Sequence, residues 1–468
     1  MPAFDPDTLA AWTGGRWSRR PEAAPCGFSV DSRRMSRGQA FVALKTGRRD
    51  GHDFLCDALG AGAAAAVVAR QNPAVALAQL VVADPLAALQ AIARQHRRGF
   101  RGTVIGVTGS AGKTSTKELL ALALGGEACG VLSTEGNLNN HIGVALTLCR
   151  LDPASHRLAV IEAGISATGE MRTLAGMIDP DVALVTFVGP AHLEGLGGIE
   201  GVAREKAELA DSGRGGCICI FPSTCEAFDA FQRLPLSNRL VVEEVTEQDE
   251  GAPDTGRVAF SVSHAGEHTI VTLSYGPPPP VVATLRRITD GMAQNTALAI
   301  CAALRVGTKG DEIRQRLLSW RPSPLRGEWR RLEGRRLYLD CYNANPASMA
   351  DALAAFSAVA PRGEPRLLVI GCMEELGPEA ERYHLELGRS LKLRRGDQLV
   401  AIGDLAAAIR QGALEAGGEP DQINVADEVG PMSARISAFR GSVFVKGSRR
   451  HGLERAFTGA EFAEATHA

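Results

Sequence analysis

The sequence of 468 residues has little net charge, no long apolar run and no compact set of cysteines. Its 51 basic and 53 acidic side chains give a formal charge of -2, so nothing suggests nucleic acid or another polyanion as a partner. The longest apolar candidate, AGAAAAVV at 61–68, is far shorter than the ~20 residues that cross a bilayer. The first residues lack the basic start and apolar stretch of a signal peptide. We therefore expect a soluble, cytoplasmic protein without a membrane span.

The ten cysteines are scattered along the chain rather than grouped. Several lie inside apolar runs, as in Cys217-Ile-Cys219-Ile. No second cysteine or histidine pair at zinc-like spacing accompanies the segment from Cys217 to Cys225. We expect buried free thiols in a reducing compartment, and neither disulfides nor a zinc site.

Length and pattern predict an α/β protein of three domains, because a chain of this size is too long for one core. Residues 1–100 mix short strand-like and helical runs, which indicates a small α/β domain. In residues 101–322 strands alternate with helices, as in a parallel sheet with both faces covered, and we expect a small antiparallel addition at about 250–288. The Pro-rich segment 321–329 marks the next boundary. Residues 323–468 repeat the alternation, which predicts a Rossmann-like domain.

The strongest motif is GVTGSAGKTS at 106–115, between a predicted strand and a predicted helix. Glycines let backbone N–H groups converge on phosphate oxygens, and the helix N-terminus adds positive potential. Lys113 would neutralise the β- and γ-phosphates of a nucleotide, and the Thr114 hydroxyl would ligate Mg²⁺. GTPases, kinases and motor ATPases share such a loop, so it does not name the reaction. The strict pattern has glycine where this chain has Val107, and an ordinary glycine-rich turn is the alternative. The predicted nucleotide-binding residues are Gly109, Ser110, Ala111, Gly112, Lys113, Thr114 and Ser115.

Two further polar residues follow predicted strands, whose carboxyl ends converge on the ligand crevice of a parallel sheet. Glu162 ends RLAVIE, and His192 follows VALVTFVGPAH. Together they could bind a divalent cation through oxygen and nitrogen. Taken singly, the glutamate is also explained by solvation and the histidine by a surface or capping role. Lys206, in GVAREKAELA, is by itself typical of a solvated helical lysine.

Several segments resemble the Mur ligases of peptidoglycan assembly, in order and over nearly the whole chain. They are DSRR (31–34), GQAFVALKTGRRDGHDF (38–54), GVTGSAGKTSTK (106–117), GNLNNHIG (136–143), AHLE (191–194), YNANPASMADAL (342–353), GCMEELG (371–377) and VKGS (445–448). The first two segments resemble the domain that binds the uridine nucleotide in this family.

The resemblance implies an ATP-dependent ligase with two Mg²⁺ ions. It would join D-alanyl-D-alanine to UDP-N-acetylmuramoyl-tripeptide through an acyl phosphate, as a monomer with small-molecule substrates only. It implies catalytic roles for Lys113, Glu162, His192 and Lys206. Metal binding would fall to Thr114, Glu162, His192 and a carbamylated Lys206, because a carbamate turns a cation into an anionic oxygen ligand.

The resemblance also assigns binding residues. Asn295, Arg326 and Asp340 would contact ATP, the last two once the domains close and exclude water. The substrate-binding residues would be Ser32, Arg33, Asn137, Asn139, Asn140, His141, Tyr342, Asn343 and Asn345. Whether the third residue of the peptide is lysine or diaminopimelate stays open.

The chain departs from the family pattern at several positions. Cys372 stands where Asp is usual, Cys341 and Phe187 occupy positions that are usually polar, and the His-Asn pair that normally precedes Asn295 is missing. Two alternatives therefore stay open: a ligase on this scaffold with another amine or acid, and an ATP-binding homologue that has lost the chemistry. The presence of all the implied catalytic residues argues against the second.

Overall fold

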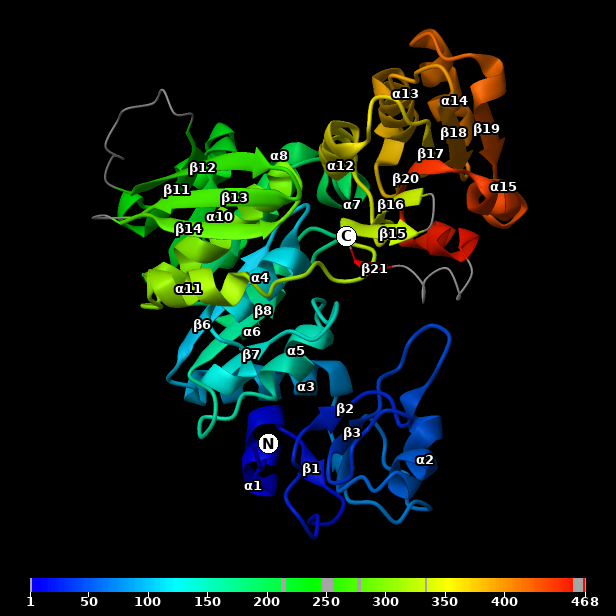
Figure 1. Cartoon of the computed structure of the whole chain (residues 1–468). Helices are drawn as coiled ribbons and strands as arrows, with labels where there is room; N and C mark the ends of the chain where they lie inside the picture. The colour runs from blue at the N-terminus through cyan, green and yellow to red at the C-terminus, as the bar shows by residue number, and fades with distance from the viewer. Residues whose placement is uncertain are drawn as a thin grey trace.

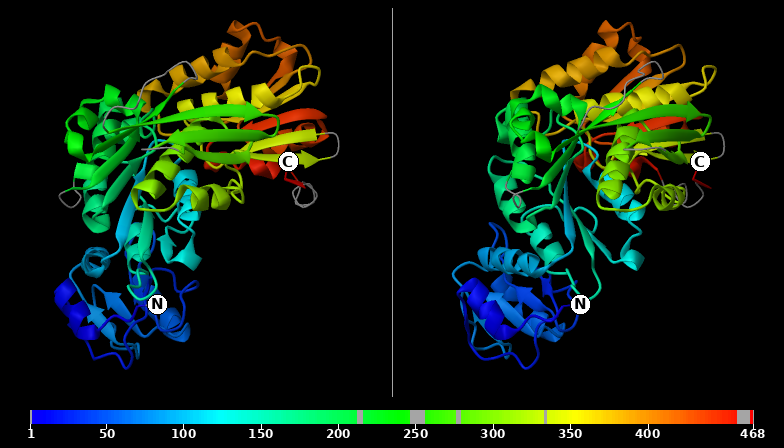
Figure 2. Two further views of the ribbon diagram at one scale, coloured as in Figure 1. Left: turned by 60° about the vertical axis from the view of Figure 1, so that its left-hand side comes forward. Right: turned by 90° about the vertical axis from the view of Figure 1, so that its left-hand side faces the viewer.

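The computed structural model describes residues 2–211, 216–245, 256–275, 279–332 and 335–457, together with the backbone of residues 466–467. Three β-sheets follow one another along the chain, and each forms a lobe with its own helices (Figure 1, Figure 2). We call these the first, central and third lobes. The predicted α/β class and three-part architecture are confirmed.

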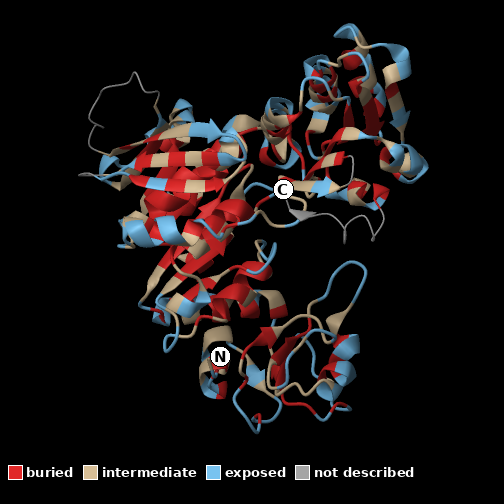
Figure 3. Ribbon diagram, viewed as in Figure 1, coloured by how far each residue is buried: buried red, intermediate tan, exposed pale blue. Residues whose placement is uncertain are grey.

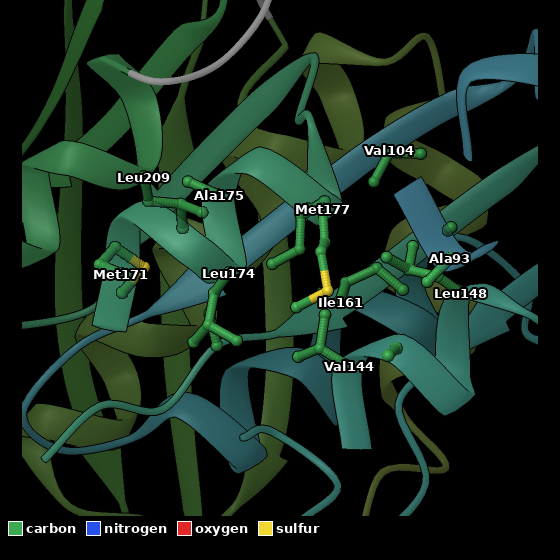
Figure 4. Close-up of a cluster of buried hydrophobic side chains, with 14 of the residues drawn as sticks. Ala93, Val104, Val144, Leu148, Ile161, Met171, Leu174, Ala175, Met177 and Leu209 are labelled. Atoms are coloured by element: carbon green, nitrogen blue, oxygen red, sulfur yellow. The ribbon is translucent and has the colours of Figure 1, made fainter. Parts of the chain in front are cut away.

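The first lobe holds a five-stranded sheet in the order β1-β5-β4-β3-β2. Its elements are α1 (Pro6–Thr13), β1 (Arg16–Trp17), β2 (Phe28–Ser29), β3 (Ala40–Val42), α2 (Leu55–Gly60), β4 (Ala65–Val68), β5 (Gln79–Val81) and α3 (Pro85–Gly99). Helix α3 begins sharply, because the Asp84 side chain accepts the N–H groups of Leu86 and Ala87 and a proline follows the cap. Its apolar face also packs against the central lobe, so one hydrophobic core runs through both lobes (Figure 4).

The central lobe holds a nine-stranded sheet in the order β14-β13-β12-β11-β10-β9-β6-β8-β7. Its strands are β6 (Thr103–Thr108), β7 (Val131–Ser133), β8 (Leu158–Glu162), β9 (Val182–Val185), β10 (Ile218–Pro222), β11 (Arg239–Glu244), β12 (Arg257–Ala265), β13 (His268–Ser274) and β14 (Val281–Arg286). Strands β12, β13 and β14 pair antiparallel, which confirms the predicted addition at this edge. Two prolines of the β13–β14 connection, Pro277 and Pro278, lie outside the described residues.

Helices cover both faces of the central sheet. They are α4 (Lys113–Ala123), α5 (Gly143–Leu148), α6 (Glu170–Ile178), α7 (Leu193–Leu196), α8 (Ile199–Asp211), α9 (Asp229–Gln232), α10 (Asp290–Arg305) and α11 (Gly310–Leu317). Side chains alternate along β6: Val104 packs in the core with α6 and α8, whereas Ile105 and Val107 pack with α4 and α10. The interior of this helix–sheet–helix sandwich is accordingly buried (Figure 3).

The third lobe holds a seven-stranded sheet in the order β19-β18-β17-β20-β16-β15-β21. Its elements are β15 (Glu328–Leu332), β16 (Arg335–Asp340), α12 (Pro346–Val359), β17 (Arg366–Gly371), α13 (Ala380–Ser390), β18 (Gln398–Ile402), α14 (Ala406–Glu415), β19 (Ile423–Ala426), α15 (Ser433–Ala438), β20 (Gly441–Lys446) and β21 (Thr466–His467). The strands from β19 to β16 are parallel, as the Rossmann-like prediction requires, and the antiparallel β15 and β21 complete one edge.

The domain limits at 100/101 and 322/323 stay predictions, although the strands of the three sheets fall on their respective sides of them. All ten cysteines are free thiols, and seven are buried, as expected. Among the residues that the structure describes, no helix has the length and apolar character needed to cross a membrane.

Two features of the fold position the site. Strand β6 lies between β8 and β9, with Val107 opposite Glu162 and Thr108 opposite Val185, so the loops after these strands open at one edge. The third lobe touches that edge, because the Asn345 side-chain amide donates to the Ser110 carbonyl at 3.1 Å.

Candidate active site

The glycine-rich segment forms a tight loop between β6 and α4. Gly112 caps α4 with a φ of 76°, and a Cβ at this position would lie 2.2 Å from Nδ2 of Asn295. A Cβ at Gly109 would lie 1.8 Å from Oγ1 of Thr186. Only glycine fits either position, which leaves the loop backbone open to a ligand. The Lys113 ammonium donates to the Gly109 carbonyl at 2.8 Å, across the loop.

Glu162 lies at the centre of a buried polar cluster beside this loop, with none of its surface exposed. Its Oε1 accepts from the Thr114 hydroxyl at 3.1 Å and from the Asn139 amide at 2.7 Å. Its Oε2 has no hydrogen-bond partner in the described part of the chain, but the Lys117 ammonium lies 3.8 Å away. That ammonium also donates to the Gly136 carbonyl at 3.1 Å. The cluster thus joins the phosphate loop, β8 and the loop that carries Asn139.

Lys117 is a residue that the sequence analysis did not single out. It is buried, with 3% of its surface exposed, and lies three positions after Thr114 on α4. Residues at this spacing share one helix face, so the position of Thr114 toward the site already indicated where Lys117 points.

Lys206 is 2% exposed, so its interpretation as a solvated helical lysine is wrong. Burial, together with the positive charge of Lys113, holds its pKa well below the ordinary value. Burial, together with the positive charge of Arg326, lowers the pKa of Lys113, although the negative charge of Glu162 opposes this shift. Burial thus disfavours the charged form of both lysines, and a bound anion would favour it again.

His192 adopts a left-handed backbone conformation, with a φ of 53°. Its Nδ1 pairs with the Glu375 carboxylate of the third lobe, and the backbone N–H of Leu193 donates to the Glu375 carbonyl at 3.1 Å. Burial lowers the pKa of the imidazole, although Glu375 opposes this shift. The described part of the chain contains no group of three or more His, Cys, Asp or Glu side chains that could hold a metal. Glu162 and His192 therefore form no complete cation site on their own.

A cavity of about 450 Å³ lies between the central and third lobes, and we call it the interlobe cavity. The predicted site residues that line it are Ser110, Ala111, Gly112, Lys113, Thr114, Ser115, Asn137, Asn139, Glu162, Asn295, Arg326, Asp340, Tyr342, Asn343 and Asn345. Gly109, His192 and Lys206 lie outside its lining. The cavity therefore joins the phosphate loop to polar groups far along the sequence.

The third-lobe wall of this cavity is held by charged contacts. The Arg326 guanidinium stacks 3.7 Å from the centre of the Tyr342 ring. The Lys446 ammonium, 1% exposed, pairs with Asp340 at 2.5 Å and donates to the Asn343 carbonyl at 3.3 Å. Lys446 falls in the VKGS segment, but no role was predicted for it.

The other predicted substrate-binding residues lie away from this cavity. Arg33, after β2 in the first lobe, is mostly exposed and pairs with Asp31 at 2.8 Å, and hydrogen bonds from Arg33 lower the pKa of Asp31 to about 2. Ser32 lies beside it and is half-buried. The Asn140 side chain accepts the N–H groups at positions 142 and 143, just before and at the start of α5, and the His141 carbonyl accepts from the Gln90 amide at 3.5 Å.

Three family descriptions match the chain. The Mur ligase middle domain matches residues 107–303, the Mur ligase glutamate ligase domain matches residues 325–449, and the Mur ligase family catalytic domain matches residues 27–97. These matches cover most of the first lobe, the central lobe and the third lobe.

Named relatives agree with these matches. The UDP-N-acetylmuramoyl-tripeptide–D-alanyl-D-alanine ligase of Escherichia coli (strain K12) is 35% identical over 384 residues, which is 81% of this chain and 82% of that protein. The Bacillus subtilis (strain 168) ligase of the same name is 31% identical, over 83% of this chain and 82% of its own.

Solved structures agree as well. One crystal structure of MurF from Acinetobacter baumannii superposes with a TM-score of 0.83 at 27% identity, covering 97% of this chain and 98% of that one. The MurF ligase from Thermotoga maritima in complex with ADP superposes with a TM-score of 0.77 at 27% identity, covering 92% of this chain and 96% of that one.

Proposed function

Because this chain belongs to the Mur ligase family, we propose that it joins D-alanyl-D-alanine to UDP-N-acetylmuramoyl-tripeptide, with ATP converted to ADP and phosphate. The observation that carries the proposal is the interlobe cavity, where the phosphate loop of one lobe faces Arg326, Asp340 and Asn345 of the other. A ligase of this kind must hold a triphosphate and a carboxylate together, and this cavity supplies cations and amides on both sides.

ATP occupies the interlobe cavity in this proposal. The loop N–H groups and Lys113 bind the phosphates, since the loop leads into the N-terminus of α4. Asn295, 7% exposed and beside Gly112, faces the base, while Arg326 and Asp340 reach the phosphates and ribose. Asn345 helps to close the third lobe over the loop through its bond to Ser110, which keeps water from the reacting groups.

The reaction has two steps. A carboxylate oxygen of the tripeptide attacks the γ-phosphorus, the bond to ADP breaks, and an acyl phosphate forms. The amine of D-alanyl-D-alanine then attacks the acyl carbon, the carbon–oxygen bond to phosphate breaks, and the amine loses a proton as the amide forms. Lys113 offsets the negative charge that gathers in both steps.

The residues around Glu162 fit a magnesium ion. The Thr114 hydroxyl contacts this carboxylate, and no described residue forms a hydrogen bond to the buried Oε2, so an oxygen ligand is available beside the phosphate loop. When bound, Mg²⁺ offsets the repulsion between the triphosphate and the substrate carboxylate.

A second ion needs further ligands, for which we propose Glu162, His192 and a carbamylated Lys206. The lowered pKa of Lys206 supports this, because a neutral amine attacks CO₂ to form a nitrogen–carbon bond and releases a proton. The Glu375 contact of His192 must then give way when the ion binds.

We further propose that the uridine nucleotide binds at Ser32 and Arg33 in the first lobe, and that the sugar and peptide run past the loop 137–141 toward the third lobe. The residues of that path are Asn137, Asn139, Asn140, His141, Tyr342, Asn343 and Asn345. The enzyme acts in this proposal as a monomer in the cytoplasm, where ATP is supplied.

Oxygen-isotope transfer tests the reaction. The tripeptide substrate is labelled with ¹⁸O in its terminal carboxylate and incubated with ATP, Mg²⁺, D-alanyl-D-alanine and the protein. We expect one labelled oxygen in each phosphate released. Phosphate that carries no label would exclude the acyl phosphate route.

A further inference from the structure

A second cavity of about 440 Å³ lies beside the interlobe cavity, and we call it the arginine cavity. The two cavities share a wall made of Ile288, Trp320, Pro322 and Gly327. The rest of the lining comes from the β12–β13 turn and the end of β14 in the central lobe, and from β15, β16 and α12 in the third lobe. Neither the sequence motifs nor the proposed reaction uses this space.

The arginine cavity carries an excess of positive charge. Two glutamates line it, and both are already paired: Glu267 with Arg331, and Glu328 with Arg330 at 2.9 Å. The arginines of the lining outnumber these two glutamates. They are Arg286, Arg287, Arg321, Arg330, Arg331 and Arg336. Within the described ranges, neither Arg287 nor Arg336 has a carboxylate partner, and the Arg321 guanidinium donates only to backbone carbonyls.

Two buried donors in the wall lack an acceptor among the residues that the structure describes. They are Nε of Arg287 and Nε1 of Trp320, and Trp320 is only 4% exposed. A buried donor left unsatisfied costs roughly 1–3 kcal/mol, so native proteins keep few of them without a reason. Both donors stand in the same cavity wall, where a ligand with acceptor oxygens would satisfy them.

The remaining wall is apolar. Its lining includes Ile288, Pro322 and Trp329, together with Ala358 and Val359 of α12. A guanidinium group can donate two parallel hydrogen bonds to the oxygens of one phosphate. Aromatic and aliphatic side chains pack against the faces of a flat ring.

We propose that the arginine cavity is a binding site for a small organic phosphate, with its phosphate on Arg287, Arg336 and Nε1 of Trp320, and its apolar part against the apolar lining. Both lobes supply these groups, since Arg287 follows β14 and Arg336 lies on β16. A bound ligand therefore favours the arrangement in which the third lobe contacts the phosphate loop. In that arrangement it strengthens the binding of ATP in the adjacent interlobe cavity.

Calorimetry with phenyl phosphate tests the site, because this probe combines a doubly charged phosphate with a flat ring. The full chain is first saturated with a non-hydrolysable ATP analogue, so that the interlobe cavity is filled. We expect phenyl phosphate still to bind at one site, and inorganic phosphate and phenol to bind at least about ten-fold more weakly.

The double variant Arg287→Gln/Arg336→Gln should weaken phenyl phosphate binding at least about ten-fold while its affinity for the ATP analogue in the absence of phenyl phosphate stays unchanged. The matched control is Arg233→Gln, a side chain 81% exposed and paired with Asp229, which should behave as the unaltered protein. Phenyl phosphate that only competes with the analogue, or binds the double variant equally well, overturns the proposal. These results do not depend on ligase turnover, so the site and the proposed reaction can fail separately.

Discussion

Replacing Lys117 by methionine tests how the buried charge of Glu162 is supported. The change removes the ammonium 3.8 Å from Oε2 and keeps a side chain of similar length. Coulomb's law at an effective dielectric constant of about 20 gives roughly 4 kcal/mol for this pair. Mutational studies of buried ion pairs give about 3–5 kcal/mol when one partner is removed, because the other charge stays buried without compensation. We therefore expect Lys117→Met to lower the free energy of unfolding by about 4 kcal/mol.

Urea unfolding followed by circular dichroism measures this loss. Lys309→Met, an exposed lysine of the same lobe, is the matched control and should change stability by less than about 0.5 kcal/mol. A double-mutant cycle with Glu162→Gln separates the pair from its surroundings, and the double variant should be more stable than Lys117→Met alone. If Lys117→Met is as stable as the Lys309 control, or the cycle shows no coupling, the reasoning about this cluster is wrong.

Three further predictions concern the loop, the third lobe and the modified lysine. Gly112→Ala should weaken ATP binding in calorimetry at least about ten-fold, because the added Cβ would meet Asn295. The control Gly307→Ala, at φ +91° with open space around the added Cβ, should bind ATP as the unaltered protein does. Equal ATP affinities of the two variants would contradict this reasoning. Burial alone would raise the pKa of Asp397, but hydrogen bonds from its arginine partners lower it on balance, so its stabilising effect is complete above about pH 4 and is lost as the pH falls toward the folded-state pKa. Asp397→Asn should therefore lower the free energy of unfolding in urea by about 3 kcal/mol at pH 7 and by clearly less at pH 3. An equal loss of stability at both pH values would refute this prediction. Lys206→Ala should slow phosphate release on the order of 100-fold and regain part of it with added formate or acetate, and full activity without them would exclude the carbamate.

Local chemistry made part of the site predictable. The loop around Lys113 depends on glycine conformation and on a strand–turn–helix order that lie within ten residues of sequence, and Glu162 ends a strand whose apolar residues mark it as central. These features depend on local sequence and not on how the lobes are arranged. The sequence alone therefore predicts that they lie at one edge of the sheet.

Other features depend on tertiary packing and could not be predicted. Helical spacing indicates only that Lys117 shares a helix face with Thr114. The burial of Lys117 and of Lys206 follows from how α4 and α8 pack on the sheet. The contact of His192 with Glu375 joins loops of different lobes, so a strand-end argument that places His192 near a cation misses the partner it has in the structure. The departures Cys341 and Cys372 are buried thiols, whereas Phe187 lines the interlobe cavity.

The most direct test of the central claim is phosphate release with a panel of amines. The protein is incubated with ATP, Mg²⁺, UDP-N-acetylmuramoyl-tripeptide and one amine at a time, and the products are weighed by mass spectrometry. The account predicts phosphate release and UDP-N-acetylmuramoyl-pentapeptide with D-alanyl-D-alanine, and neither when the tripeptide is left out. Turnover only with a different amine, or nucleotide binding without any turnover, would contradict it.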